Sequence, residues 1–237
     1  MTRHVPGSAA ALVALLLAIP TAPADAYVTV PVDVTPSIAV VDSSDAVAAR
    51  LAEAAATAGL RNEVLELGIR AHARVRAEGR TSSPILTVID YSLPSREPRL
   101  WVLDLDKGAV LERELVAHGN GTGGDIATAF SNRPGSNQSS LGTFLTGKIY
   151  YGKHGKSLRL HGLDEGLNDL AFQRAIVVHG ATYVNPGIVD QLGRLGRSQG
   201  CPALSPEASA RIIELIRDGS VIFSYHPSAA LETKLPA

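Results

Sequence analysis

The stretch His179 to Leu204, HGATYVNPGIVDQLGRLGRSQGCPAL, holds the residues that decide the fold and the chemistry of this chain. Its histidine follows the apolar run 175–178, which is typical of a fully buried strand. Its cysteine, Cys201, is the only one among 237 residues and directly follows Gly200. A strand end holds an imidazole rigidly, so any pairing of Cys201 with His179 requires the fold to return this loop to the strand.

Cys201 and His179 have the residue types of a nucleophile and its base. A free thiol has a pKa of about 8.5 and is mostly protonated at neutral pH, so a neighbouring histidine is needed to remove its proton. Gly200 leaves room for a substrate carbonyl, and the amides of Gly200 and Cys201 are candidates for an oxyanion hole. The alternative is that Cys201 is a buried small hydrophobic residue and His179 a hydrogen-bonded core histidine.

Residues 1–26 have the pattern of a secretory signal peptide. Arg3 and His4 precede an apolar stretch over 9–19, and Ala-Asp-Ala at 24–26 fits a cleavage site. The apolar stretch is too short to remain as a membrane-spanning helix. We therefore expect an exported protein, periplasmic or associated with the cell envelope, without stable membrane insertion after cleavage. In an oxidising compartment a single cysteine forms no internal disulfide, which favours a reactive role for Cys201.

The composition argues against a nucleic-acid partner and against a metal site. Lysine and arginine number 22 against 23 acidic residues, the net charge is −1, and there is no basic run. The histidines form no H-x-x-x-H pair and there is no second thiol, so we expect no metal ligands. The length fits one catalytic domain with a helical extension.

The hydrophobic pattern predicts two helices followed by a mainly β region. Residues 27–80 form an extended lead-in and an αα-hairpin, with helices over 45–58 and 63–78. From there to residue 237 we expect a catalytic domain, 81–237, with a helix over 206–217. Its predicted strands are 85–91, 100–105, 110–117, 141–151, 157–160 and 221–225. The first three form a meander in which alternation places Trp101 and Leu103 on one face.

Several phrases of the sequence carry a resemblance to a known family. They are FSNRPGS (130–136), SLGTF (140–144), GKHGKSLRLHGL (152–163), HG (179–180) and GRSQGCPAL (196–204). Together they resemble the L,D-transpeptidase catalytic domain of the YkuD type, in its divergent murein L,D-transpeptidase branch. The resemblance covers about residues 60 to 226. It implies a mainly β, α+β fold, with a β-sandwich-like sheet, the N-terminal hairpin and a helix after the cysteine.

The resemblance also implies a function, an exported cysteine acyltransferase that acts on peptidoglycan stem peptides without a metal or organic cofactor. Cys201 is the implied nucleophile and His179 the implied base, and the backbone carbonyl of Gly180 orients the imidazole. The thiolate attacks the carbonyl between an L-centre and a D-centre, releases the terminal D-residue, and passes the acyl group to the amine of a second stem.

Two alternatives stay open. An L,D-carboxypeptidase, or a hydrolase of cross-links or attachments, uses the same pair and gives the acyl group to water. A non-catalytic wall-binding module keeps only the fold. The sequence also departs from the family pattern at two positions. Many members have an arginine two residues after the cysteine, where this chain has Ala203. A histidine is frequent before the Gly-Cys pair, where this chain has Gln199.

Five further residues are candidates for substrate contacts, namely Ser198, Arg197, His161, His118 and Asn132. Ser198 is expected to shape the nucleophile loop, and Arg197 offers a cation to a stem-peptide carboxylate, with a solvated loop charge as the alternative. His118 and His161 each precede a glycine at a strand end and could line the same cleft, although a structural hydrogen bond explains either one adequately. Asn132 lies in the long polar loop 118–140, which we expect to help find the substrate.

Overall fold

Residues 1–2 and 43–229 are described by the computed structural model, and every helix and strand belongs to the unit Val41–Ala237. The predicted signal peptide and the extended lead-in lie outside the described residues, apart from the first two residues of the chain. Among the helices of the described part, none is long and apolar enough to cross a membrane.

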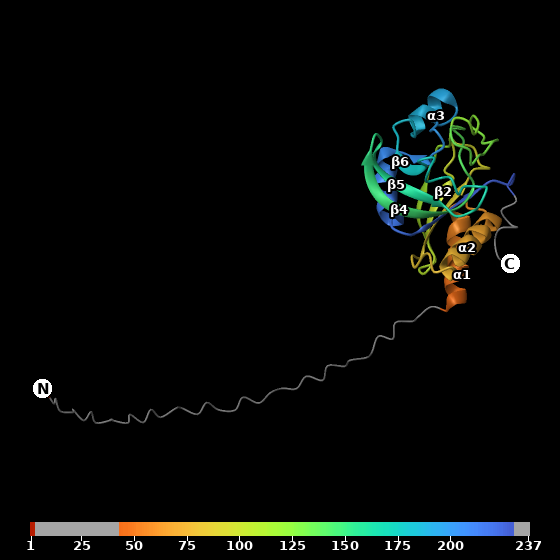
Figure 1. Cartoon of the computed structure of the whole chain (residues 1–237). Coiled ribbons are helices and arrows are strands. Elements are labelled where there is room, and N and C mark those ends of the chain that lie inside the picture. The colour runs from red at the N-terminus through yellow and green to blue at the C-terminus, as the bar shows by residue number, and fades with distance from the viewer. Residues whose placement is uncertain (3–42, 230–237) are drawn as a thin grey trace, which may run out of the picture. The chain divides into compact units, whose positions relative to one another are not determined.

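Eight strands form one mixed sheet in the order β3-β2-β1-β8-β4-β5-β6-β7 (Figure 1). The strands are β1 (Ile85–Asp90), β2 (Leu100–Asp104), β3 (Ala109–Glu114), β4 (Gly142–Gly152), β5 (Gly155–Gly162), β6 (Val177–Gly180), β7 (Ala203–Leu204) and β8 (Val221–Tyr225). The pairs β1–β8 and β6–β7 are parallel, and the other neighbours are antiparallel. Beyond β3, Ala117 pairs with Ala203 of β7, so the sheet is nearly closed.

The predicted antiparallel meander of the first three strands is confirmed. Trp101 and Leu103 pack in one core cluster while Leu100 and Val102 pack in another, as the alternation predicts. The third strand ends earlier than predicted, at Glu114, because the chain after it leaves β2 and pairs with the segment that holds Cys201.

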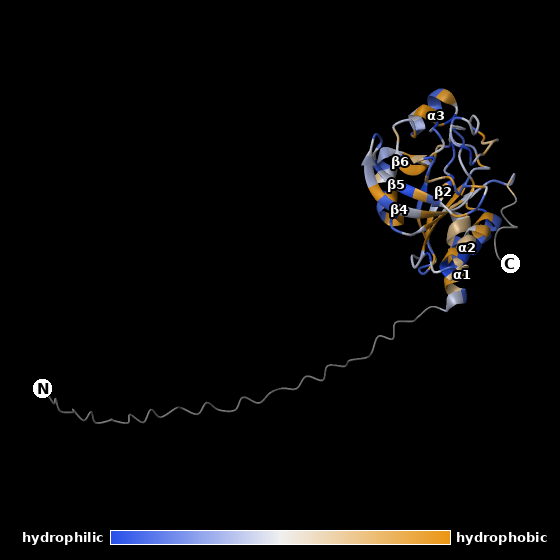
Figure 2. Ribbon diagram, in the orientation of Figure 1, coloured by the Kyte–Doolittle hydropathy of each residue, from blue (hydrophilic) through white to orange (hydrophobic). Residues whose placement is uncertain are grey.

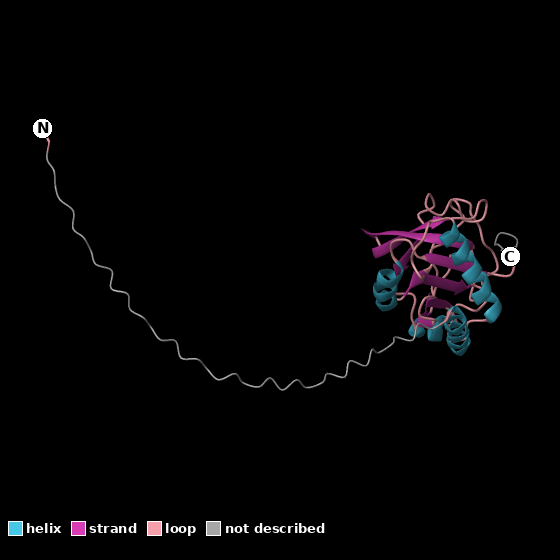
Figure 3. Ribbon diagram, turned by 90° about the horizontal axis from the view of Figure 1, so that it is seen from below, coloured by secondary structure: helices cyan, strands magenta, loops and turns pink. Residues whose placement is uncertain are grey.

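Helices lie on both faces of the sheet (Figure 3). The predicted hairpin is present as α1 (Ser44–Thr57) and α2 (Asn62–Ala77), and α2 packs on β1 and β8. Both helices carry hydrophobic and hydrophilic residues, and the hydrophobic ones contribute to a shared core with the sheet (Figure 2). On the other face, α4 (Pro206–Ile216) begins after the capping residue Ser205, as predicted. The structure adds a helix that the sequence did not indicate, α3 (Pro186–Leu192).

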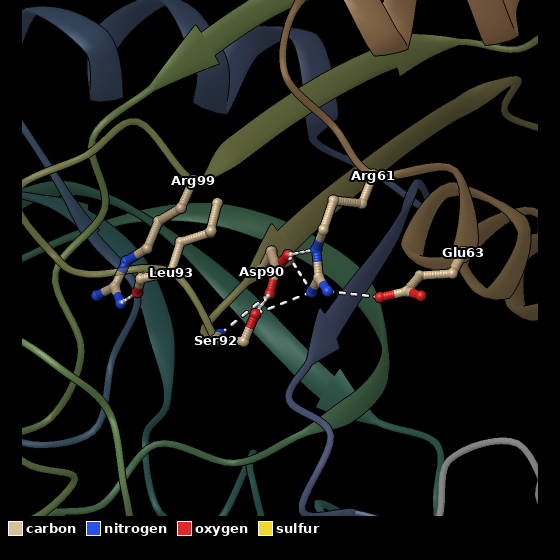
Figure 4. A network of polar contacts seen from close by, with 6 residues as sticks. All are labelled: Arg61, Glu63, Asp90, Ser92, Leu93 and Arg99. Atoms are coloured by element: carbon tan, nitrogen blue, oxygen red, sulfur yellow. Dashed lines mark hydrogen bonds and ion pairs between the residues drawn. The ribbon is translucent and has the colours of Figure 1, made fainter.

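A buried carboxylate fastens the helical hairpin to the sheet (Figure 4). Arg61, next to the start of α2, donates to Oδ2 of Asp90 from Nη2 at 2.8 Å and from Nε at 3.2 Å. The amide and hydroxyl of Ser92 donate to Oδ1 of the same residue. Because both carboxylate oxygens are satisfied, Asp90 is accommodated in the interior at the end of β1. The fold is thus the mainly β, α+β arrangement that the resemblance implied, with four helices in the described part.

Gly68 sets how closely α2 approaches the sheet. A Cβ at this position would lie 3.1 Å from Cγ2 of Val88 and 3.4 Å from Cδ2 of Leu86. We expect Gly68→Leu to lower the free energy of unfolding by about 1–3 kcal/mol, because the larger side chain forces α2 away from the strands. Urea unfolding followed by circular dichroism measures the change. Ala73→Leu, on the exposed side of α2, is the matched control, and equal losses in both variants would contradict the packing argument.

Candidate active site

His179 is held near the end of β6 with a defined proton position. It pairs with Ser157 of β5 on one side and Ala203 of β7 on the other, and the residue is 2% exposed. Nδ1 lies 3.0 Å from the carbonyl oxygen of Gly180, the contact that the resemblance implied. Because a carbonyl only accepts, Nδ1 carries the proton and Nε2 of the neutral ring keeps its lone pair. Burial lowers the pKa of His179, so the ring is mostly neutral at neutral pH.

Cys201 ends a tight turn that begins at Ser198. The hydroxyl of Ser198 donates to the carbonyl of Cys201 at 2.6 Å and accepts from the amide of Gly200 at 3.1 Å. Gly200 has a φ of +118°, and a Cβ there would lie 2.9 Å from the carbonyl oxygen of Gln138. The position therefore requires glycine, both for its backbone conformation and for the close approach of a neighbouring chain segment.

The turn corrects one expectation about the oxyanion hole. The amide of Gly200, expected as one of its donors, already donates to Ser198. The amide of Cys201 has no hydrogen-bond partner among the described residues, so it is the donor that remains free for a substrate oxygen.

The thiol of Cys201 is partly enclosed. Sγ lies 3.7 Å from the carbonyl oxygen of Ala175, and no hydrogen bond joins it to the ring of His179 in the described part of the chain. Burial raises the pKa of the Cys201 thiol, while the backbone at Val177 and the charges of Arg174 and Lys153 act in the opposite direction. A thiol in this environment needs a base before it can attack.

Cys201 and His179 line one cavity of about 640 Å³. Ser198 and Arg197 line it too, and the polar loop contributes residues between 134 and 137. The charged side chains among its lining residues, Lys153, Arg174 and Arg197, are all cationic. A second cavity of about 530 Å³ adjoins it and shares three of its lining residues, Lys153, His154 and Tyr183. The fold therefore brings the predicted nucleophile and base to one polar cavity.

A family model for the L,D-transpeptidase catalytic domain matches residues 56–225, a span that contains this cavity. The chain belongs to this family. The resemblance read from the sequence over about residues 60 to 226 is thereby confirmed. No curated protein matches the chain.

Solved structures, L,D-transpeptidases among them, are also similar to it. An L,D-transpeptidase from Mycobacterium smegmatis is 18% identical, with a TM-score of 0.37, over 61% of this chain and 59% of that one. One from Xylanimonas cellulosilytica is 17% identical, with a TM-score of 0.34, over 65% and 68%. The helical cell shape determining protein Pgp2 from Campylobacter jejuni is 11% identical, with a TM-score of 0.38, over 66% and 56%. The chain thus spans about three fifths of the M. smegmatis protein.

The two departures from the L,D-transpeptidase pattern have different surroundings. Ala203, where the family often has arginine, is fully buried in β7. Gln199, where the family often has histidine, is exposed at the cavity. Arg174, which no sequence motif indicated, lines the cavity together with Cys201. Its only sequence signal was an arginine just before an apolar strand, which is too common a pattern to indicate a site.

His154 lines the cavity of this L,D-transpeptidase domain although it is exposed in a turn. It lies at the tip of the hairpin between β4 and β5, and its ring stacks on that of His179 with centroids 4.3 Å apart and planes 25° apart. The hairpin is exposed, yet it brings a second imidazole against the predicted base.

We expect His154→Gln to lower the rate of any reaction in which His179 acts as the base for Cys201, and to do so at acidic pH only. Burial lowers the pKa of His179, and the charges of His154 and Lys153 lower it further, so removing His154 raises this pKa. A base acts in its neutral form, so a higher pKa leaves less of it active in acid, and kcat/KM should fall severalfold at about pH 5.5 with no change at about pH 8. His154→Phe keeps the ring stack without the charge and should behave like His154→Gln. An acid limb that moves in neither variant would contradict the electrostatic coupling.

His118 lies behind the nucleophile turn and does not line the cavity, contrary to its expected substrate contact. It is fully buried, and its Nδ1 lies 2.7 Å from Nη2 of Arg99. Burial, with the charge of Arg99, lowers the pKa of His118 to about 4, so the ring is neutral and accepts from Arg99. Its backbone carbonyl accepts from the amide of Ser198 at 3.0 Å. Through this hydrogen bond, His118 supports the turn that carries Cys201.

His161 and Asn132 are also absent from the cavity lining. His161 stacks on Phe172 with ring centroids 4.9 Å apart. The amide of Asn132 donates to Asp169, and its oxygen accepts from the backbone of Leu170. Structural contacts account for both side chains, and neither of them lines the cavity where a substrate contact was expected.

Proposed function

We propose that this chain is an exported cysteine acyltransferase that carries out L,D-transpeptidation on peptidoglycan stem peptides. The observation that carries the proposal is the placement of Cys201 and His179 on one cavity, with Nδ1 of His179 facing the carbonyl of Gly180, in a chain that belongs to the L,D-transpeptidase catalytic domain family. Export rests on residues 1–26, which have the pattern of a signal peptide.

The first half-reaction forms an acyl-enzyme. Nε2 of His179 takes the thiol proton as Sγ of Cys201 attacks the carbonyl between the L-centre and the D-centre of the donor stem. The free amide of Cys201 donates to the developing oxyanion. When the tetrahedral intermediate collapses, the C–N bond breaks, and the amine of the terminal D-residue leaves with the proton returned by His179.

The second half-reaction transfers the acyl group. The amine of an acceptor stem attacks the thioester, His179 takes its proton, and Cys201 leaves as a thiolate that the imidazolium reprotonates. The adjoining cavity, which shares His154 with the first, offers space for an acceptor beside the base. Cationic lining residues suit the carboxylates of two stem peptides.

The test is intact-protein mass spectrometry of the mature chain with purified tetrapeptide muropeptides, with the soluble products analysed in the same sample. Because Cys201 is the only cysteine, protein alkylated with iodoacetamide is a site-specific control. We expect an acyl adduct that alkylation prevents, together with dimeric muropeptides. Tripeptides without dimers would identify an L,D-carboxypeptidase. Absence of both adduct and turnover in folded protein would reject the proposal in favour of a non-catalytic wall-binding module or another substrate.

A further inference from the structure

Arg174 packs against the turn that carries the nucleophile. It lines the cavity and directly precedes Ala175, whose carbonyl accepts from the Cys201 thiol. A Cβ placed on Gly200 would lie 3.4 Å from Nη2 of Arg174. The guanidinium is therefore next to Gly200, the residue before the cysteine, and Arg174 and Cys201 line the same cavity.

Four hydrogen bonds hold this guanidinium in place. Nη1 donates to the carbonyl of Ser131 at 2.6 Å and to the hydroxyl of Ser140 at 2.5 Å. Nη2 donates to the carbonyl of Gln138 at 2.6 Å and to the hydroxyl of Ser136 at 3.3 Å. All four acceptors are neutral, and no ion pair joins Arg174 to an acidic residue in the described part of the chain. Its positive charge is thus fixed in position without being neutralised.

We propose that Arg174 is a positioning residue of the transfer reaction, a fixed cation that stabilises the Cys201 thiolate and holds the segment 131–140 against the nucleophile turn. Its role in transfer rests on the proposed function, whereas its effect on the thiol does not. Many family members have an arginine two residues after the cysteine, but this chain has the buried Ala203 there. Arg174 supplies a positive charge from a different place, the segment before β6. A guanidinium keeps its charge at neutral pH even when half-buried.

A fixed cation serves both half-reactions. Burial opposes formation of the thiolate, and a nearby positive charge offsets that cost. The same charge favours departure of the thiolate when the acceptor amine displaces it from the thioester. Lys153, the other cation that acts on the thiol, is at the exposed hairpin tip and has no hydrogen bond or ion pair in the described structure, so solvent screens it more.

Other titratable groups face this region and must be considered in a pH experiment. Burial raises the pKa of Tyr91 and of Tyr183 to about 12, so both phenols are neutral over the useful range. The remaining charged or titratable groups near the thiol come from β6, the β4–β5 hairpin and the nucleophile loop, namely His179, Lys153, His154 and Arg197.

The experiment measures the rate at which iodoacetamide alkylates Cys201 as a function of pH, which reports the thiol pKa without any substrate. In Arg174→Gln we expect the profile to move to higher pH and the rate at about pH 8 to fall roughly tenfold. Arg174→Lys keeps a charge but not the four anchoring bonds, so we expect a smaller fall. Arg211→Gln, which removes an exposed charge paired with Glu112 and Glu114, is the matched control and should follow the wild type.

A wild-type profile in folded Arg174→Gln would overturn the proposal. If that variant does not fold, Arg174→Met decides, because it removes the charge and keeps an unbranched side chain: a displaced profile supports the fixed cation and an unchanged one rejects it. Muropeptide turnover is measured on the same samples. A displaced thiol profile in a protein that forms no acyl adduct would refute the proposed function and leave the effect of Arg174 on the thiol intact.

Discussion

Cys201→Ser should fold like the wild type and lose L,D-transfer by about 10⁴-fold or more. The serine hydroxyl is a far weaker acid than a thiol, and burial makes His179 a weaker base than an ordinary histidine. The side chain is nearly isosteric, and the turn is held by Ser198 and Gly200 rather than by the sulfur. The loss should therefore be chemical and not structural.

Two measurements on Cys201→Ser separate these causes. Thermal unfolding followed by circular dichroism should match the wild type, and liquid chromatography of muropeptide products gives the rate. Product formation within tenfold of the wild-type rate would show that the sulfur is not the nucleophile and would remove the basis of the acyl-enzyme mechanism.

His179→Gln should reduce kcat/KM by about 10²–10⁴-fold at neutral pH. Glutamine can still donate to the carbonyl of Gly180, but it offers no basic nitrogen to the thiol. In the wild type, burial lowers the pKa of His179, so activity should rise with pH through a midpoint below the ordinary histidine value and then level off. In the variant that limb should vanish, and residual activity should rise with pH as the thiol itself ionises.

The pH dependence of acyl-enzyme formation, followed by mass spectrometry at short times, checks this prediction. His72→Gln provides a matched histidine replacement. His72 is buried in α2, is hydrogen-bonded to the carbonyl of Ser83, and does not line the cavity. It should keep the wild-type pH profile even if it lowers stability. An acid limb that persists in His179→Gln would assign the base to another group.

Much of the fold follows from short-range regularities. The alternation around Trp101 predicted a meander with two differently buried faces, and Ser205 with Pro206 predicted the start of α4, because strand periodicity and helix capping depend on neighbouring residues. The premature end of β3 and the existence of α3 were not predicted. In the first case a pairing with a segment far along the chain, at Ala203, replaced the local pattern.

The candidate site divides in the same way. The sole cysteine and the histidine at the end of an apolar strand were identifiable from the sequence, because a nucleophile and its base are defined by residue type. Arg174 was not, because its role depends on acceptors that lie 34 to 43 residues earlier in the chain. His118 was misplaced for a related reason. It precedes a glycine at a predicted strand end, yet tertiary packing buries it against Arg99, and the stacking of His154 on His179 was not predicted. Residue type can thus be read from the sequence. Burial and the proximity of other charges depend on contacts between segments that are far apart in the chain, so only the tertiary structure decides them.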